Sequence, residues 1–133
     1  VRMQRHCENT ATIAHFLNSH PKIEKVYWPG FESHPNHKVA KAQMKDYGGM
    51  LSFITKGANY QAAISIVERL KLFTLAESLG GVESLAGHPA SMTHASIPKK
   101  VREKSGVVDA LIRLSVGIED VRDLISDLEK AIG

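Results

Sequence analysis

The sequence predicts an α/β domain in which one sheet is covered by helices on one face. Short strand-like segments alternate along the chain with segments whose apolar residues recur at helical spacing. A length of 133 residues fits one domain, and 43% hydrophobic with 23% charged residues is ordinary globular composition. A chain of this size can bury a hydrophobic core, which excludes a wholly disordered or collagen-like protein.

The first helix is predicted over residues 2–18. No capping residue precedes it, since the chain begins at Val1. A helix without a start signal suggests a piece of a longer protein, and removal of a disordered leader by processing is the alternative. The predicted apolar stripe of this helix consists of Met3, Cys7, Thr10, Ile13, Ala14, Phe16 and Leu17.

Three strands and two helices are predicted between residues 20 and 75. His20-Pro21 ends the first helix, and Asn59 is placed to cap the later of the two helices. The predicted strands are 23–28, 50–55 and 72–75, and the predicted helices are 34–45 and 59–69. Their predicted inward residues are Val39 and Ala42 in the first, and Ala63, Ile64, Val67 and Leu70 in the second.

The clearest strand pattern covers residues 111–116. It sends Ile112, Leu114 and Val116 toward the core and Leu111, Arg113 and Ser115 to the other face. Residues 80–108 form the longest weakly patterned stretch, and such stretches are often functional loops. Asp120 then caps a last helix, whose predicted apolar face carries Val121, Leu124, Ile125, Leu128 and Ile132.

Composition argues against several classes of function. The excess of 17 basic over 14 acidic residues is small and spread along the chain. The densest basic stretch, residues 99–104, contains no aromatic residue, so we expect no nucleic-acid partner. No apolar run approaches the length of a membrane span, so we expect no membrane partner. A lone cysteine excludes an internal disulfide and fits a reducing cytoplasm.

The seven histidines raise the question of a metal site. His34 and His37 lie three residues apart on a predicted helical turn, and His88 and His94 lie in the weakly patterned stretch. Zinc would need further ligands, and Cys7 is distant in sequence, so we expect no metal site. The motif GxSxG does not occur, which argues against a serine nucleophile on a strand-to-helix turn.

Arg113 is the first candidate functional residue. A guanidinium in the middle of a strand, among apolar neighbours, needs an anionic partner or water. One interpretation is a solvent-facing arginine on an open sheet face. The other is a planar fork that binds a substrate carboxylate, a geometry that arginine provides better than lysine.

The segment 76–85 is the second candidate. Gly80-Gly81 allows a tight turn with positive φ and close approach of the backbone to a ligand. Taken alone, such a turn predicts a β-hairpin. The spacing matches neither the dinucleotide fingerprint GxGxxG nor a phosphate-binding P-loop.

Several motifs together resemble one enzyme family. In chain order they are VYWPGFESHPNHKVAKAQM at 26–44, GGMLSF at 48–53, AESLGGVESL at 76–85, HPASMTHASIP at 88–98 and LIRLSVGIED at 111–120. The chain resembles, over essentially its whole length, the C-terminal domain of the cystathionine γ-synthase/γ-lyase branch of the Cys/Met-metabolism family. The enzymes of this family depend on pyridoxal 5'-phosphate (PLP).

The resemblance implies the small C-terminal domain of a fold-type I PLP enzyme, an α+β sandwich with a mostly antiparallel sheet. In this family a larger N-terminal domain binds PLP through a lysine, and the enzymes are usually homotetramers. No match to those PLP-binding segments occurs in the present sequence. We therefore expect residues 1–133 to form a substrate-recognition domain that binds no PLP itself and is inactive alone.

The resemblance also implies roles for individual residues. Arg113 matches the arginine that binds the substrate α-carboxylate. Ser78 matches a serine near the PLP-lysine, and Leu79 contributes backbone beside it. Glu77 matches an acidic residue at the distal end of the substrate, where methionine γ-lyases commonly have an apolar residue. Thr93 matches the loop at the pocket rim.

The expected function is therefore substrate recognition in a cytoplasmic cystathionine γ-synthase or γ-lyase of transsulfuration. The expected substrate is cystathionine or a homoserine ester. The sequence leaves synthase and lyase unresolved. Two alternatives stay open: a related PLP enzyme such as methionine γ-lyase or cystathionine β-lyase, and a non-enzymatic binding domain that reuses the fold.

Overall fold

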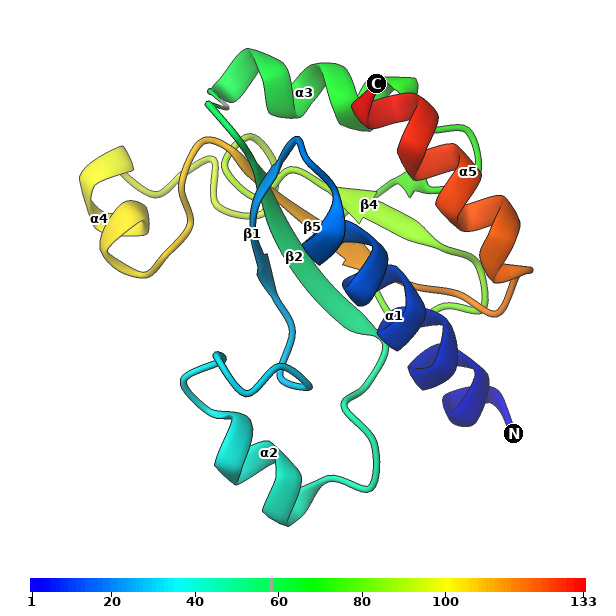
Figure 1. Cartoon of the computed structure of the whole chain (residues 1–133). Helices are drawn as coiled ribbons and strands as arrows, with labels where there is room; N and C mark the ends of the chain where they lie inside the picture. The colour runs from blue at the N-terminus through cyan, green and yellow to red at the C-terminus, as the bar shows by residue number, and fades with distance from the viewer. Residues whose placement is uncertain (58) are drawn as a thin grey trace.

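The computed structural model describes residues 1–57 and 59–133, and it contains one five-stranded sheet in the order β1-β2-β5-β4-β3 (Figure 1). Neighbouring strands are antiparallel except for β3 and β4, which are parallel. The predicted α/β class with a mostly antiparallel sheet is thus confirmed. The strands are β1 (Ile23–Tyr27), β2 (Met50–Thr55), β3 (Thr74–Leu75), β4 (Leu85–Gly87) and β5 (Leu111–Ser115).

Three helices cover one face of this sheet (Figure 1). They are α1 (Arg2–Ser19), α3 (Tyr60–Arg69) and α5 (Val121–Ile132). Helix α1 packs on β1 and β2, α3 packs on β5, and α5 contacts both α1 and α3. Two shorter helices, α2 (His37–Gln43) and α4 (Lys99–Lys104), lie outside this layer. In the part of the chain that the structure describes, no helix is both long and apolar enough to span a membrane.

The core lies between the sheet and these three helices. The alternation predicted for the central strands is confirmed, because Phe53, Ile112 and Leu114 are fully buried. Burial of each large apolar side chain contributes about 1.5–3 kcal/mol, so these strands hold the domain together. Their fully buried helical partners are Ile13, Ala14 and Leu17 in α1, Ala63 in α3, and Leu124, Leu128 and Ala131 in α5.

Two predicted helix caps are present. The Asn59 carboxamide oxygen accepts a hydrogen bond from the Ala62 backbone N–H at the start of α3. The Asp120 carboxylate accepts one from the Arg122 backbone N–H at the start of α5. Each cap satisfies a backbone donor that the first turn leaves without an intrahelical partner.

The inward faces predicted for α2 and α3 are wrong in detail. Helix α2 spans seven residues, and only its Ala40 is buried, while Val39 is 54% exposed and Ala42 is exposed. The reason is that α2 lies outside the helical layer and has little of the sheet to pack against. In α3 the predicted Ala63 and Val67 are buried, as is Leu70 at its end, but the fourth buried position is Ile66 and the predicted Ile64 is half-buried.

The stripe predicted for α1 also needs correction. Met3 is 53% exposed, whereas His6 and Asn9 are buried. The His6 Nδ1 atom hydrogen bonds to the Val116 carbonyl oxygen at 2.6 Å, and the Asn9 amide donates to the Gly117 carbonyl oxygen. Polar side chains are thus buried on α1 because they bind backbone groups just after β5.

Residues 80–108 contain two elements that sequence reasoning missed, β4 and α4. Residues 80–81 do not close a hairpin, because β3 and β4 run parallel, with Thr74 opposite Leu85. The positive φ expected there is present, at 77° for Gly80. A three-residue strand that is buried throughout offers no alternation for sequence analysis to detect.

Candidate functional site

Arg113 lies in the middle of β5, between Ser52 of β2 and Gly87 of β4. Because Ile112 and Leu114 fill the core side, its side chain leaves by the opposite face of the sheet, where it is partly exposed. Its Nη2 atom donates a hydrogen bond to the Ser78 carbonyl oxygen at 3.4 Å. No ion pair found among the described residues includes Arg113. The guanidinium therefore keeps donors available for an anion.

Gly87 lies against this guanidinium. A Cβ atom at position 87 would lie 3.6 Å from the Arg113 Nη2 atom and 3.4 Å from the Ala76 carbonyl oxygen, both ordinary van der Waals distances. Sequence reasoning missed Gly87, although a glycine inside a strand is a signal of close approach by a neighbouring group.

The segment 76–84 joins β3 to β4 and carries three of the predicted site residues. Glu77, Ser78 and Leu79 are all exposed, and Leu79 is 56% exposed. Ser78 contacts Arg113 through its backbone carbonyl and not through its hydroxyl. The structure therefore brings this segment against Arg113 while leaving its side chains open to a ligand or a partner surface.

A shallow depression brings the polar candidates together; its empty space of about 140 Å³ includes open solvent, and it has no room for a whole water molecule. Arg113 and Glu77 line it with opposite charges, and Thr93 contributes a hydroxyl. Ser78 and Leu79 lie beside the depression but do not line it. The remaining lining residues are Ala76, Gly87, His88, Pro89 and Met92. A cation, an anion and a hydroxyl lie here beside apolar side chains, and such groups can bind a small zwitterion.

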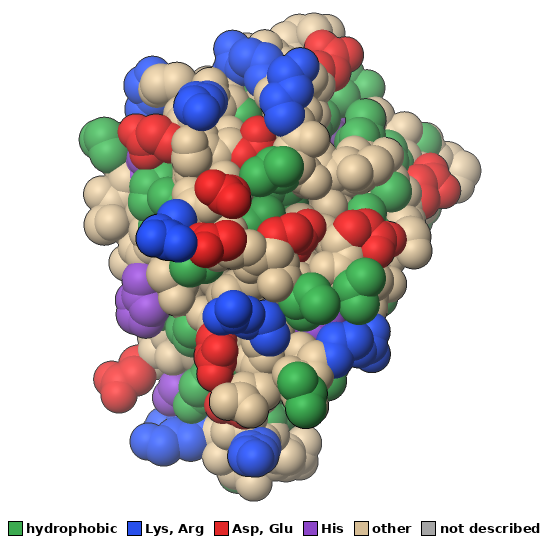
Figure 2. All heavy atoms as spheres, turned by 90° about the vertical axis from the view of Figure 1, so that its right-hand side faces the viewer, with side chains coloured by type: hydrophobic (Ala, Val, Ile, Leu, Met, Phe, Trp, Pro, Cys, Tyr) green, Lys and Arg blue, Asp and Glu red, His purple; other side chains and the backbone are tan. Residues whose placement is uncertain are grey.

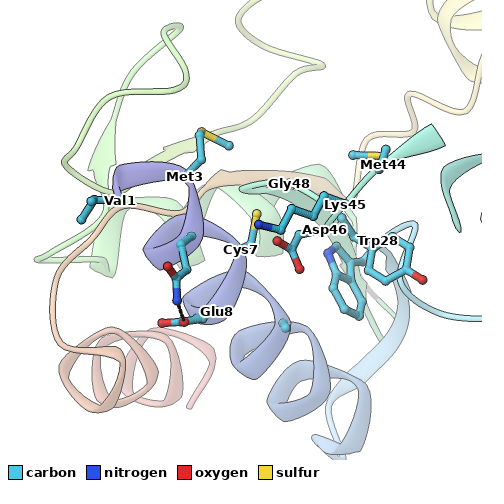
Figure 3. A pocket seen from close by; sticks show the side chains of 12 residues that line it. Val1, Met3, Cys7, Glu8, Trp28, Met44, Lys45, Asp46 and Gly48 are labelled. Atoms are coloured by element: carbon cyan, nitrogen blue, oxygen red, sulfur yellow. Dashed lines mark hydrogen bonds between the residues drawn. The ribbon is translucent and has the colours of Figure 1, made fainter.

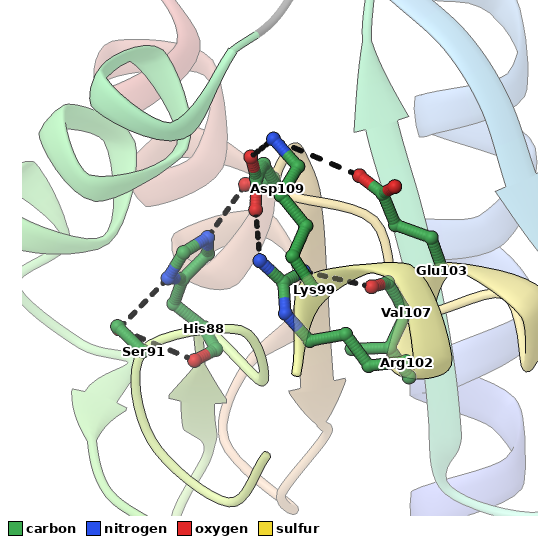
Figure 4. A network of polar contacts seen from close by, with 7 residues as sticks. All are labelled: His88, Ser91, Lys99, Arg102, Glu103, Val107 and Asp109. Atoms are coloured by element: carbon green, nitrogen blue, oxygen red, sulfur yellow. Dashed lines mark hydrogen bonds and ion pairs between the residues drawn. The ribbon is translucent and has the colours of Figure 1, made fainter. Parts of the chain in front are cut away.

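His88 holds the Thr93 side of this depression in place (Figure 4). Its side chain is fully buried, and its Nε2 atom donates to the Asp109 carbonyl oxygen at 2.7 Å. The Nδ1 atom and the Ser91 hydroxyl form a second hydrogen bond, at 2.8 Å. Because a carbonyl oxygen can only accept, the bond to Asp109 requires a proton on Nε2. His88 was predicted only as a possible metal ligand, and the structure shows it linking two backbone segments.

The carboxylate of Asp109 extends this network to α4 (Figure 4). Lys99 and Arg102 both donate to it, and these hydrogen bonds hold the pKa of Asp109 below its usual value. The same carboxylate raises the pKa of Lys99. The basic stretch 99–104 is thus partly neutralised by Asp109.

A larger hollow, of about 990 Å³, lies between α1 and residues 44–48 (Figure 3). Its walls carry Met3, Cys7, Trp28 and Met44, with the charged Lys45 and Asp46 at its border. None of the residues predicted for the site lines it. Among the described residues, no three His, Cys, Asp or Glu side chains form a group that could hold a metal ion. The depression around Arg113 is therefore the better candidate site.

Comparison with known proteins agrees with the sequence motifs. Residues 1–133 match the family model described as Cys/Met metabolism PLP-dependent enzyme. The chain is 54% identical to the L-methionine γ-lyase of Fusobacterium nucleatum subsp. nucleatum, over 99% of this chain and 33% of that protein. It is 55% identical to the cystathionine β-lyase of Coxiella burnetii, over 99% and 34%. The cystathionine γ-lyase of Sus scrofa is also 55% identical, over 99% and 32%.

The fold is shared as well. The crystal structure of metB from Corynebacterium glutamicum matches with a TM-score of 0.91 and 49% identity, over 98% of this chain and 33% of that one. The chain thus spans about one third of the length of these relatives. Because the family model covers every residue, the chain belongs to the Cys/Met-metabolism family of PLP-dependent enzymes.

Proposed function

We propose that this chain is the substrate-recognition domain of a PLP-dependent cystathionine γ-synthase or γ-lyase. The observation that carries the proposal is the meeting of Arg113, Glu77 and Thr93 around one depression. These side chains come from β5 and from the segments that flank β4, which are far apart in sequence. Their charges complement an amino acid that carries a carboxylate at one end and an ammonium group at the other.

Arg113 is the group we assign to the substrate α-carboxylate. Its guanidinium is planar and can donate two parallel hydrogen bonds to a carboxylate. The Ser78 carbonyl oxygen accepts a hydrogen bond from one edge of the guanidinium, at 3.4 Å. Binding a carboxylate in a fixed plane orients the rest of the substrate and lowers the entropic cost of the reaction.

Glu77 is the group we assign to a distal ammonium, as cystathionine carries. It lines the same depression as Arg113, so both ends of a zwitterionic substrate would be recognised in one place. The second candidate function is methionine γ-lyase or cystathionine β-lyase activity. It is favoured by relatives that bear those names at the same level of identity.

The residues of the depression do not fit PLP itself. None of the eight residues that line it is a lysine, and its only cation is Arg113. A volume of about 140 Å³ is also small for a cofactor site. In the enzyme, PLP would supply the electron sink that such reactions require. We infer that residues outside this chain hold PLP, and that these 133 residues alone are inactive.

Exposed apolar side chains around the depression support a covering partner domain. Leu75, Leu79 and Val82 are each about half exposed, between 48% and 56%. Figure 2 shows one face of the molecule on which apolar side chains lie between charges of both signs. Exposed apolar groups beside a site are typical of domain interfaces. We propose that the PLP-binding part of the protein covers them within a cytoplasmic homotetramer.

The test uses the full-length protein, meaning the polypeptide that joins these residues to the remaining length found in the relatives. Arg113→Lys keeps the charge but removes the planar fork. We expect kcat/KM to fall by the equivalent of about 2–4 kcal/mol, as for loss of a charged hydrogen-bonded contact. Arg122→Lys is the matched control, since Arg122 is exposed and distant in the fold. A wild-type kcat/KM for Arg113→Lys would refute the proposal.

A further inference from the structure

We propose that Glu119 is a positioning residue, which acts through Ser84 to fix the segment 77–84 against the strand that carries Arg113. This inference rests on the proposed function, because it affects activity only if Arg113 and Glu77 bind the substrate. Glu119 itself does not line the depression. Its effect would pass through hydrogen bonds that end at the predicted substrate-binding segment.

The carboxylate of Glu119 binds Ser84 at two points. Its Oε1 atom accepts from the Ser84 backbone N–H at 2.7 Å, and its Oε2 atom accepts from the Ser84 hydroxyl at 2.9 Å. The same hydroxyl accepts a hydrogen bond from the Gly117 N–H at 2.8 Å. Ser84 is fully buried, and a hydrogen bond to a charged group is stronger than a neutral one. This pair is therefore a well-defined anchor.

Asn9 of α1 holds the other side of the anchor. Its amide nitrogen donates to the carbonyl oxygens of Gly117 and Glu119, at 3.0 and 2.9 Å. The backbone around Gly117 also approaches residue 82 closely, and a Cβ atom at Gly117 would overlap the Val82 carbonyl oxygen. Residues 117–119 are thus held on one side by α1 of the helical layer and bind the segment 77–84 on the other.

Two further hydrogen bonds join the segment to the end of β5. The Gly80 N–H donates to the Ser115 hydroxyl at 2.8 Å, and the Ile118 N–H donates to the Val82 carbonyl oxygen at 2.9 Å. The segment is therefore bound at residues 80, 82 and 84 to the stretch 115–119. Arg113 precedes this stretch by two residues, so one strand fixes both the guanidinium and the segment that carries Glu77.

These contacts matter for position because residues 77–80 are exposed. Besides them, two exposed hydrogen bonds reach the segment, from the Arg2 Nη1 atom to the Gly80 carbonyl oxygen at 3.0 Å and from the Arg113 Nη2 atom to the Ser78 carbonyl oxygen at 3.4 Å. A surface segment without buried apolar contacts keeps its conformational freedom unless hydrogen bonds restrict it. Recognition of a small substrate requires its groups to be held within about 0.5 Å of the productive geometry.

The experiment measures steady-state kinetics of the full-length protein with Glu119→Gln, Glu119→Ala and Ser84→Ala. L-Cystathionine is the probe, or an O-acyl-homoserine if cystathionine is not turned over. We expect Glu119→Ala to lower kcat/KM about tenfold, mostly through a higher KM, as for loss of a hydrogen bond to a charged group. Glu119→Gln keeps one acceptor for the Ser84 N–H and should lose less. Hydrogen exchange in residues 76–84 should rise in the same order.

Glu68→Gln is the matched control, because Glu68 is an exposed carboxylate on α3, outside the segment 77–84. It should leave KM and hydrogen exchange at their wild-type values. If Glu119→Ala does not fold, the kinetics of Glu119→Gln and Ser84→Ala decide the question, once their melting temperatures are shown to equal that of the wild type. Unchanged KM in those variants, with Arg113→Lys impaired, would overturn this inference alone. Unchanged kcat/KM in Arg113→Lys would overturn the proposed function.

Discussion

At the scale of single residues, Arg113 shows how a charged side chain is accommodated inside a sheet. The core side of β5 is filled by Ile112 and Leu114, so the arginine can only face outward. Gly87 lies opposite it, and the Ser78 carbonyl accepts one donor. The alternation of apolar residues was sufficient to predict the direction of this side chain. Its neighbours Gly87 and Ser78 come from other segments, so the alternation within β5 could not predict them.

Glu77 carries the specificity prediction at this scale. In the full-length protein, we expect Glu77→Val to lower the ratio of kcat/KM for L-cystathionine to that for L-methionine. A distal ammonium would lose its charged partner, a loss of about 2–3 kcal/mol when both groups are desolvated. L-Methionine has no distal ammonium and should be little affected. Glu68→Val, at an exposed carboxylate on α3, is the control, and an unchanged ratio for Glu77→Val would remove Glu77 from the site.

At the scale of elements, Asp127 of α5 fixes the chain as it enters β3. Its carboxylate accepts hydrogen bonds from the backbone N–H groups of Lys71, Leu72 and Phe73, at 2.8–3.1 Å. Asp127 is only 6% exposed, and its hydrogen bond with Phe73 is buried, while those with Lys71 and Leu72 are partly buried. Periodicity predicted the apolar face of α5 but gave no signal for this polar contact.

Asp127→Ala should therefore destabilise the domain. One buried and two partly buried N–H groups would lose a charged acceptor, and we expect the free energy of unfolding to fall by about 2–4 kcal/mol. Urea denaturation followed by circular dichroism measures this change. Glu68→Ala, an exposed carboxylate on α3, is the control and should change the free energy by less than about 0.5 kcal/mol. A loss as small as that in Asp127→Ala would contradict the assignment.

The cap of α5 gives a prediction about pH. Hydrogen bonds from the Arg122 side chain, and from its backbone N–H, lower the pKa of Asp120 to about 2. A carboxyl whose pKa is lower in the folded state stabilises that state above its unfolded pKa of about 4. This contribution is lost as the pH falls toward 2. Asp120→Asn should therefore lose less stability than the wild type between pH 4 and pH 2.

Thermal unfolding of both proteins across that pH range, with the Asp120 carboxyl titrated by NMR, checks the prediction. The comparison isolates Asp120 from Asp109, whose pKa is also lowered and which is unchanged in the variant. Parallel acid profiles for the two proteins, or an Asp120 pKa near 4, would contradict it.

Sequence reasoning missed β4 and α4 for the same physical reason. Strand β4 has three residues, all buried, and α4 has six residues at the surface. Neither is long enough to show a period, and both are fixed by tertiary contacts such as the pairing of Gly87 with Arg113. The long amphipathic helix α5 and the central strand β5 were predictable because their own sequence alternates. The residues of the candidate site were proposed from family motifs, whereas nothing in the sequence indicated the contacts of Ser84 and Glu119.

At the scale of the whole molecule, the two faces of the sheet have different roles. One face packs against α1, α3 and α5 and provides stability, while the other presents Arg113 beside Glu77 and Thr93. In our account this second face recognises the substrate, and the rest of the enzyme supplies PLP. The central claim is that the Arg113 guanidinium binds the α-carboxylate of the substrate.

The most direct test is a cycle that changes both partners of this contact. In the full-length protein, kcat/KM is measured for wild type and Arg113→Ala. Each is tested with L-cystathionine and with the analogue in which the α-carboxylate of the reacting end is a carboxamide. If the guanidinium binds the carboxylate, the carboxamide should be much poorer for the wild type but not for Arg113→Ala. The coupling energy should then be about 1.5–3 kcal/mol. Two independent losses that simply add would show that Arg113 and the carboxylate do not interact, and would contradict the account.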